Sequence, residues 1–268
     1  MTVTKREILI SIILGCLSLC LGLAIDSWIV DWQTNAAEKY SKALKVNNDN
    51  SMFKYALETN VGDVIAYGKF VVEKGVTDSW LKNDYMYIEK VTEKYNRHTR
   101  TVCTGSGKSR SCRTETYYSW DKEDSEEKNV KKLNFSGVDF SFGDFSSYPK
   151  YKLQLSKENV VKKKQDKIKN NCIYEKIRTF GSNVGDKRYY YNVVNKSFYG
   201  TVFGKAKNSK LISESKKLDI NSGNINDFIE SNKNGFIIGR IFFWIIYIGL
   251  CGVGIYCYIA YENDYLED

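Results

Sequence analysis

Two apolar stretches near the ends of the chain constrain its fold more than any other feature. The first runs from Ile8 to Ile25 without an ionisable residue, and the second runs from Ile241 to Tyr261. A helix needs about 20 apolar residues to cross a hydrocarbon layer of about 30 Å, because lipid offers its backbone no hydrogen-bond partners. The sequence therefore predicts two transmembrane helices around a long polar segment. Buried core helices are the alternative.

A cleaved signal peptide is a second alternative for the first stretch, with Lys5 and Arg6 as its charged start. Its apolar run is longer than usual for a signal peptide, and no small-x-small cleavage motif precedes Asp26. The sequence around Cys16 resembles a lipoprotein box, but the apolar run continues well past it. We therefore expect an uncleaved, unlipidated anchor.

The charge of the chain is concentrated in its middle. The whole chain carries +8; because residues 1–30 are neutral and residues 235–268 carry −3, the segment between them carries +11. A basic domain beside a bilayer is attracted to anionic head groups by about 1 kcal/mol per cation. A solvated lysine-rich surface is the alternative. Nucleic-acid binding is not expected, because the run Lys162, Lys163, Lys164 has no interleaved aromatic residues.

The charges that flank the two stretches disagree about orientation. Lys5 and Arg6 precede the first stretch, which places the N-terminus in the cytoplasm by the positive-inside rule. Lys233 and Arg240 precede the second stretch and favour the opposite orientation. Since the charges beside the first helix usually determine the orientation of a membrane protein, we predict a two-pass protein with both termini cytoplasmic and the central domain extracytoplasmic or luminal.

The segment from Tyr95 to Trp120 alternates and is typical of a β-hairpin. If Gly107 and Lys108 form its loop, residues whose numbers sum to 215 face each other. The opposed pairs are then rich in threonine and aromatic residues, which stabilise antiparallel ladders. Cys103 would face Cys112 at a separation that a disulfide can bridge. Such a bond persists in an oxidising compartment, in agreement with an extracytoplasmic domain.

The remaining cysteines and two sequons fit this topology. Cys172 would be unpaired or intermolecular, and the four cysteines within the apolar stretches are expected to pack as small apolar residues. Asn134 and Asn195 begin N-x-S sequons. Glycosylation there applies only to a luminal domain of a eukaryotic protein.

No motif in the sequence predicts an active site. Gly107, Lys108 and Ser109 resemble the end of a phosphate loop, but Val102 occupies the position of the required glycine. His98 is the only histidine, which disfavours a hydrolytic triad and a zinc site. Asp139 and Asp144 are interpreted as turn residues rather than a catalytic pair. We expect no enzyme activity, no cofactor and no metal.

The pattern along the chain predicts an α+β membrane protein, in which two transmembrane helices flank one mainly antiparallel β domain. Helical spacing continues after the first apolar stretch, and alternation begins at Gly62. The predicted units are an N-terminal tail and helix (1–32), a helical connector (33–61), a β-rich domain (62–223), an amphipathic lead-in with the second helix (224–262), and an acidic tail (263–268). The predicted strands are Val64–Val72, Tyr85–Val102, Cys112–Trp120, Asp139–Phe145, Lys150–Leu155, Arg188–Val194 and Tyr199–Phe203.

Several segments resemble a known family. The order of GDVIAYGKF, VTDSW, YMYIEKVTEKY, a later Trp120 and NGFIIGRIFFWIIYIGL is similar to the LUMA-type transmembrane proteins. It is more distantly similar to the beside-a-membrane domain of GIDE-type ubiquitin ligases. Both resemblances imply a β-rich domain held against a bilayer. LUMA-type proteins continue into further membrane helices, whereas this sequence ends at Asp268. It has no RING zinc module, so the ligase activity is not expected.

The apolar stretches also contain residues suited to helix pairing. Ser11, Gly15, Ser18 and Gly22 share one helical face, where a neighbouring backbone can approach closely. Gly249, Gly252 and Gly254 offer a partner surface. Asp26 and Arg240 would lie at the same membrane face and form an ion pair. In the alternative, Arg240 reaches the head groups and the small face forms a homo-oligomer.

Two hypotheses for function follow. In the first, the protein is a non-enzymatic scaffold whose basic β domain recruits lipid or membrane and extracytoplasmic protein partners. In the second, it is a surface receptor, or an exclusion factor of a phage or virus, whose hairpin tip at Lys108 and Arg110 binds an external ligand. A membrane enzyme is the least favoured class.

Overall fold

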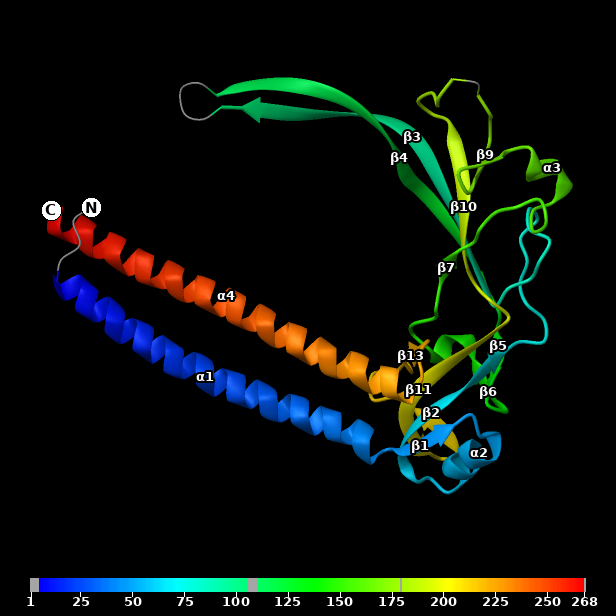
Figure 1. Cartoon of the computed structure of the whole chain (residues 1–268), viewed down its shortest axis with the longest axis horizontal. Coiled ribbons are helices and arrows are strands. Elements are labelled where there is room, and N and C mark those ends of the chain that lie inside the picture. Colours follow the sequence, from blue (N-terminus) through cyan, green and yellow to red (C-terminus); the bar gives the residue numbers. More distant parts are fainter. Residues whose placement is uncertain (1–4, 106–109, 179, 268) are drawn as a thin grey trace.

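The computed structural model describes residues 5–105, 110–178 and 180–267. Two long helices, α1 (Lys5–Lys42) and α4 (Ile225–Glu267), lie side by side and run in opposite directions (Figure 1). The start of α1 and the end of α4 lie at the end of the helical pair that is distant from the β domain (Figure 1). The described residues between the helices fold into that domain, as the sequence predicts.

The first sheet has seven strands and receives both helices. Its central order is β12-β11-β2-β5-β6, with β1 parallel to β2 and β13 antiparallel to β11. The strands are β1 (Leu44–Asn47), β2 (Gly62–Val71), β5 (Lys132–Phe135), β6 (Val138–Ser141), β11 (Ser197–Lys207), β12 (Lys210–Ile212) and β13 (Ile220–Asn221).

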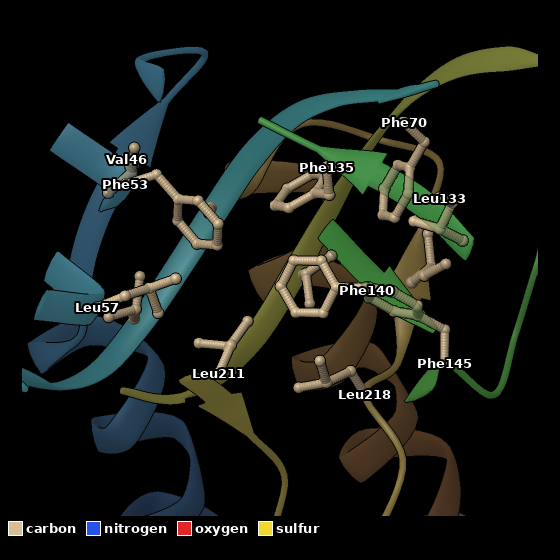
Figure 2. Close-up of a cluster of buried hydrophobic side chains, with 14 of the residues drawn as sticks. Val46, Phe53, Leu57, Phe70, Leu133, Phe135, Phe140, Phe145, Leu211 and Leu218 are labelled. Atoms are coloured by element: carbon tan, nitrogen blue, oxygen red, sulfur yellow. The ribbon is translucent and has the colours of Figure 1, made fainter. Parts of the chain in front are cut away.

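The largest hydrophobic core lies against this sheet (Figure 2). Phe53 of α2 (Asn50–Glu58) packs edge-on against Phe135, which also contacts Phe70, and all three side chains are fully buried. The Asp49 carboxylate caps α2 by accepting hydrogen bonds from the amides of Ser51 and Met52. The helix is thereby held against the sheet by packing on one side and by its cap at one end.

The second sheet has six strands in the order β4-β3-β10-β9-β8, with β7 paired to β10. They are β3 (Tyr87–Thr104), β4 (Ser111–Asn129), β7 (Tyr151–Lys152), β8 (Ile168–Lys169), β9 (Cys172–Tyr174) and β10 (Lys187–Val194). A short helix α3 (Lys162–Gln165) follows β7, and a 3-10 turn η2 (Phe142–Asp144) follows β6. This sheet has its own core, centred on Tyr191 and Ile173.

A third cluster fastens the helical pair to the first sheet. Ala43 at the end of α1 and Phe228 of α4 are buried together with Ile65 of β2. Tyr40 packs edge-on against Phe203 and Phe228, with ring centroids 4.8 and 5.6 Å apart. The amphipathic lead-in is thus the first part of α4 itself, and its apolar side covers the sheet.

The structure corrects several predicted boundaries. The connector 33–61 is not wholly helical, because residues 44–47 form β1 on the edge of β2. The predicted strand Cys112–Trp120 is longer in the structure, since β4 continues to Asn129. The predicted strand Lys150–Leu155 contains only the two residues of β7, and Asp139–Phe145 divides into β6 and η2. Ladders between named strands in the described parts of the chain are antiparallel except for β1 with β2.

Candidate functional site

An ion pair joins the two long helices at the end of the first apolar stretch. The Asp26 carboxylate accepts hydrogen bonds from Nε and Nη2 of Arg240, at 2.6 and 2.5 Å. Only 6% of Asp26 is exposed. Two parallel hydrogen bonds fix the orientation of both groups as well as their separation. The pair predicted from the sequence is therefore present, and Arg240 points toward α1 rather than away from it.

A second ion pair joins the helices near their other ends, where Arg6 of α1 meets Glu262 of α4. About 20 residues separate Arg6 from Asp26, which corresponds to about 30 Å along a helix. Residues 8–25 and 241–261, between the two pairs, contain no charged side chain. The distance matches the thickness of the hydrocarbon layer of a bilayer.

Apolar side chains in this interval point outward from the helical pair. Leu17 of α1 is 62% exposed and Leu250 of α4 is 66% exposed, and many of their isoleucine and leucine neighbours are equally open. A helix that is apolar on its outer faces is expected inside a protein core or in lipid. In the described residues nothing from the β domain covers this surface. Both helices are long and apolar enough to cross a membrane.

The small residues of α1 form part of the contact with α4. Gly22 lies under the ring of Tyr247, and a Cβ atom added at Gly22 would come within 2.6 Å of that ring. The Tyr247 hydroxyl donates a hydrogen bond of 2.5 Å to the backbone carbonyl of Ser18. A serine and glycine face on α1 therefore accommodates a large aromatic side chain of α4. Ser11 is half-buried on the same face. A Cβ atom added at Gly15 would have no heavy atom within 4 Å, so the predicted contribution of Gly15 to close packing is wrong.

The predicted contribution of Gly249 and Gly252 to this contact is wrong. Both glycines are exposed on α4, and a Cβ atom added at either would have no heavy atom within 4 Å. The same is true of Gly254. The reason is steric: the small face of α1 receives the bulky side of α4, so the glycine side of α4 is turned outward. Tyr247 and Glu262 are among the contact residues that the sequence analysis missed.

A long two-stranded ribbon projects from the second sheet (Figure 1). β10 pairs with β3 only from Tyr87 to Lys94, so beyond Lys94 the ribbon consists of β3 and β4 alone; we call residues 95–105 and 110–120 the arm. Its register is the predicted one, with opposed residue numbers that sum to 215 from Tyr95 opposite Trp120 to Thr104 opposite Ser111. An irregularity between Thr92 and Glu93 ends this register at the base of the arm.

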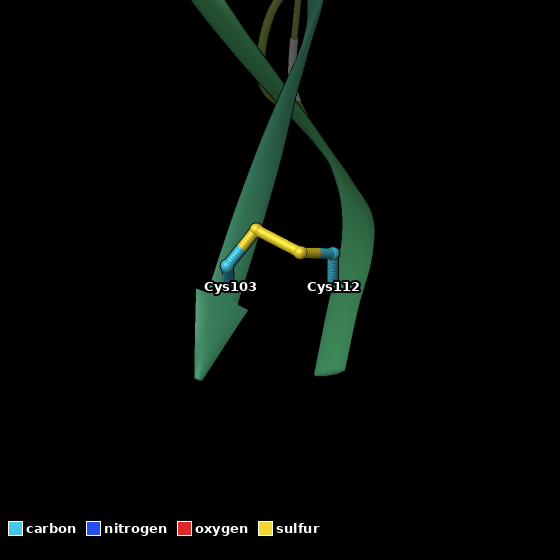
Figure 3. The surroundings of a disulfide bond; sticks show 2 residues. All are labelled: Cys103 and Cys112. Carbon is cyan, nitrogen blue, oxygen red and sulfur yellow. A yellow bond between two sulfur atoms is a disulfide. The ribbon is translucent and has the colours of Figure 1, made fainter. Parts of the chain in front are cut away.

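A disulfide closes the arm near its tip (Figure 3). Cys103 and Cys112 are opposed in the ladder, with their Cα atoms 4.0 Å apart, and their sulfur atoms are bonded. This prediction is confirmed. Cys172 is a free thiol in β9 and is only 2% exposed. Burial raises the pKa of the Cys172 thiol, so in the folded protein it is unsuited to form an intermolecular bond.

One side of the arm carries a polar network at its base. The Asp121 carboxylate lies 2.7 Å from Nε2 of His98 and accepts hydrogen bonds from Ser119 and Asn96. These hydrogen bonds, that of Ser119 first, lower the pKa of Asp121. His98 also stacks on Tyr117, with ring centroids 5.1 Å apart. The orientation of the His98 ring is thus fixed by the Asp121 carboxylate and the Tyr117 ring.

The outer part of the arm carries exposed arginine side chains. Arg100 and Arg113 both donate to the Glu115 carboxylate, whose pKa they lower, while their own side chains remain 65% and 77% exposed. Arg110 is exposed as well. Lys108, the other residue predicted to make contacts at the tip, lies outside the described residues. The arm therefore presents cationic groups to its surroundings.

The two sequons differ in accessibility. The Asn134 side chain bonds to Asp139 and to the amide of Gly137, and Ser136 of its sequon is 4% exposed. Asn195 lies in the exposed turn between β10 and β11 and accepts a hydrogen bond from the Tyr151 hydroxyl. Of the two, only Asn195 has an accessible sequon.

The acidic residues considered for catalysis close turns instead. Asp139 bonds to Asn134, and Asp144 accepts a hydrogen bond from the Ser141 amide as part of a capping box. In the parts of the chain that the structure describes, no group of three histidine, cysteine or acidic side chains could hold a metal ion.

A cleft of about 390 Å³ beside Tyr40 is lined by residues of mixed charge, among them Lys39, Glu214 and Asp219.

No family model, curated protein or solved structure matches this chain.

Proposed function

We propose that the protein is a two-pass membrane scaffold. In this proposal α1 and α4 cross one bilayer as a pair, and the β domain is held on the extracytoplasmic or luminal side, where it binds membrane and extracytoplasmic protein partners without catalysing a reaction. The observation that carries the proposal is the apolar interval of about 30 Å between the Arg6–Glu262 and Asp26–Arg240 ion pairs.

Three features support it. The outward apolar side chains of the helices would be costly in water and favourable in lipid. The Cys103–Cys112 disulfide favours an oxidising compartment for the β domain. The aromatic cluster of Tyr40, Phe203 and Phe228 connects the helices rigidly to the first sheet, which suits a domain held at a fixed position beside the membrane. The LUMA-type resemblance is part of the same proposal and implies the same arrangement.

Alkaline carbonate extraction of membranes tests the anchoring step. The full chain is expected to stay in the membrane pellet. Leu250→Glu, which puts a charge on the lipid-facing side of α4, is expected to move a clear fraction of the chain to the supernatant. The matched control Tyr199→Glu places the same charge at a 45% exposed position of the β domain and should stay in the pellet. Complete extraction of the unaltered chain would refute the proposal.

A further inference from the structure

One face of the second sheet, opposite to the face that packs on its core, carries a row of basic and aromatic side chains. Five adjacent strands each contribute one of them, in the order Trp120 (β4), Tyr95 (β3), Arg188 (β10), Tyr174 (β9) and Lys169 (β8). Tyr95 is opposite Trp120, and Arg188 is opposite Tyr174. Glu93 is opposite Arg188 and lies two residues before Tyr95, so all of these side chains point to the same face.

A pocket of about 300 Å³ lies at the base of the arm and is lined by this row. The rest of its lining comes from the ends of the neighbouring turns: Asn170, Lys176, Ile177, Arg178, Gly181 and Ser182. Trp120 packs edge-on against Tyr174, with ring centroids 5.7 Å apart, and the Tyr95 ring lies 5.2 Å from that of Trp120. The volume is at the lower end of the range for small-molecule sites, so the pocket suits a small ligand.

The two arginines of the pocket are oriented by carboxylates that do not line it. Nε of Arg188 donates a hydrogen bond of 2.6 Å to Glu93, and Cζ of Arg188 lies 4.4 Å from the centroid of the Trp120 ring. Nε and Nη2 of Arg178 donate to the two carboxylate oxygens of Asp186, at 2.8 and 3.1 Å. The side chains of Glu93 and Asp186 are only 16% and 8% exposed. A guanidinium has five N–H groups, so both arginines keep donors for a ligand.

The charge of the pocket is strongly positive. Among the described residues its lining contains four basic side chains and no acidic one; the four are Lys169, Lys176, Arg178 and Arg188. Glu93 and Asp186 balance the two arginines. No ion pair in the described parts of the chain joins Lys169 or Lys176 to a carboxylate, and both lysines are exposed. Four cations less two carboxylates leave a net charge of +2.

A phosphate group matches this arrangement in charge and in geometry. It carries about −1.5 to −2 at pH 7 and has three strong acceptor oxygens, whereas a sulfate ester has only a single negative charge. Oriented guanidinium groups bind phosphate through parallel charge-assisted hydrogen bonds, which are stronger than hydrogen bonds between neutral groups. The aromatic rings beside the arginines would contact the remainder of a small ester.

We propose that this pocket binds a dianionic phosphate group, either free or carried by a small ester. Arg178 and Arg188 donate hydrogen bonds to its oxygens, and Lys169 and Lys176 supply the two charges that are unbalanced in the empty pocket. The inference goes beyond the proposed function. It does not depend on whether α1 and α4 cross a bilayer, because the pocket is formed by the strands and turns of the second sheet.

Isothermal titration calorimetry of the full chain in detergent micelles tests the inference. The probes are inorganic phosphate, glucose 6-phosphate and glucose 6-sulfate. Glucose 6-phosphate is expected to bind roughly tenfold more tightly than glucose 6-sulfate, because the sulfate has one charge less and forms weaker hydrogen bonds. Tighter binding of glucose 6-phosphate than of inorganic phosphate would support the site with an ester as its ligand. Equal binding of the two would support it with free phosphate as the ligand.

Charge-neutralising variants locate the binding. Lys169→Gln with Lys176→Gln removes two exposed charges that form no ion pair in the described structure, so it should leave the fold intact. A hydrogen bond to a charged group contributes roughly tenfold in affinity, so the double variant should bind glucose 6-phosphate roughly 100-fold more weakly. The control is Lys162→Gln with Lys163→Gln in α3, which removes the same charge from two exposed positions outside the lining. It should bind glucose 6-phosphate as tightly as the unaltered chain.

Three results would overturn the inference. The first is the absence of binding of both phosphates at millimolar concentration. The second is equal affinity for glucose 6-phosphate and glucose 6-sulfate, since the pocket would then not distinguish a dianion. The third is an equal loss of affinity in the α3 control, since net charge alone would then account for binding. If the pocket variant fails to fold, the comparison of the phosphate and sulfate esters with the unaltered chain still decides between the outcomes.

Discussion

The carboxylate of Asp26 and the guanidinium of Arg240 meet through two hydrogen bonds of 2.6 and 2.5 Å, although 214 residues separate them in the chain. Their pairing sets the register of α1 against α4. It also marks the level at which the charge-free interval of the two helices begins.

Removing one partner of this pair should weaken the association of the helices. Asp26→Leu leaves Arg240 without its carboxylate, and Arg240→Leu leaves a buried carboxylate unpaired, so both single variants are expected to lose helix pairing. The double variant should recover most of it, because no charge remains unpaired. Disulfide crosslinking between Trp32→Cys and Phe236→Cys, whose rings lie 6.2 Å apart, measures pairing once the four helix cysteines are replaced by alanine. Unchanged crosslinking in both single variants would contradict the prediction.

A bulky residue at Gly22 should separate the helices, whereas the same change at Gly249 should not. Gly22→Leu places atoms where the Tyr247 ring lies, and the hydroxyl of that tyrosine is bonded to Ser18. Overpacking of this kind costs about 1–3 kcal/mol. Gly249→Leu enters open space. The same crosslinking assay compares the two variants, and an equal loss at both positions would show that the outward glycines also form a contact.

Tyr191→Phe is expected to destabilise the β domain by about 1.5–3 kcal/mol, because the buried Asp78 carboxylate loses one of its hydrogen bonds and keeps the one that it accepts from the Trp80 amide. The Tyr191 hydroxyl donates a hydrogen bond of 2.9 Å to Asp78, which is 5% exposed. Burial beside this carboxylate raises the pKa of Tyr191, so the hydroxyl stays protonated and continues to donate. Chemical denaturation measures the loss. Tyr117→Phe, at an exposed position of the arm, is the control and should change the stability little.

Stability of the second sheet should fall in acid because of Glu89. Its carboxylate accepts hydrogen bonds from Asn192 and Lys122, and these, that of Asn192 first, lower its pKa from the ordinary value of 4.5. A carboxylate with a lowered pKa binds fewer protons in the folded state, so its contribution is present above pH 4.5 and is lost as the pH falls through the folded pKa. Glu89→Gln should lower the stability at neutral pH and flatten its decline in acid. An unchanged slope would assign the acid sensitivity to other carboxylates.

The features that could be predicted from the sequence are those determined locally. The register of the arm follows from alternation, paired threonines and two cysteines within one short segment, and the helices follow from uninterrupted apolar composition. β1 could not be found in this way, because Ala43 and Leu44 continue the helical spacing of Ala36, Ala37 and Tyr40. Residues 44–47 become a strand only by pairing with β2. The charged end of β4 also lacks an apolar pattern, since it lies at the edge of its sheet with most of its side chains exposed.

The contact between α1 and α4 could likewise be predicted from the sequence only in part. The small face of α1 and the Asp26–Arg240 pair could be predicted, because small residues at helical spacing and opposite charges at one membrane face are visible in the sequence. The side of α4 that meets this face could not be predicted from the sequence. It depends on the fit of Tyr247 over Gly22 and on the Arg6–Glu262 pair, and these are relationships of shape between segments far apart in the chain.

Thiol labelling in intact cells measures on which side of the membrane the β domain lies. A membrane-impermeant maleimide is expected to leave Cys103 and Cys112 unmodified at first and to label both after treatment with an impermeant phosphine reductant. Cys172 should stay unreactive until the protein is unfolded, because it is buried, and a cysteine introduced by Asp268→Cys should react only after lysis. Labelling of Cys103 and Cys112 only in lysed cells, with Asp268→Cys accessible from outside, would contradict the proposed topology.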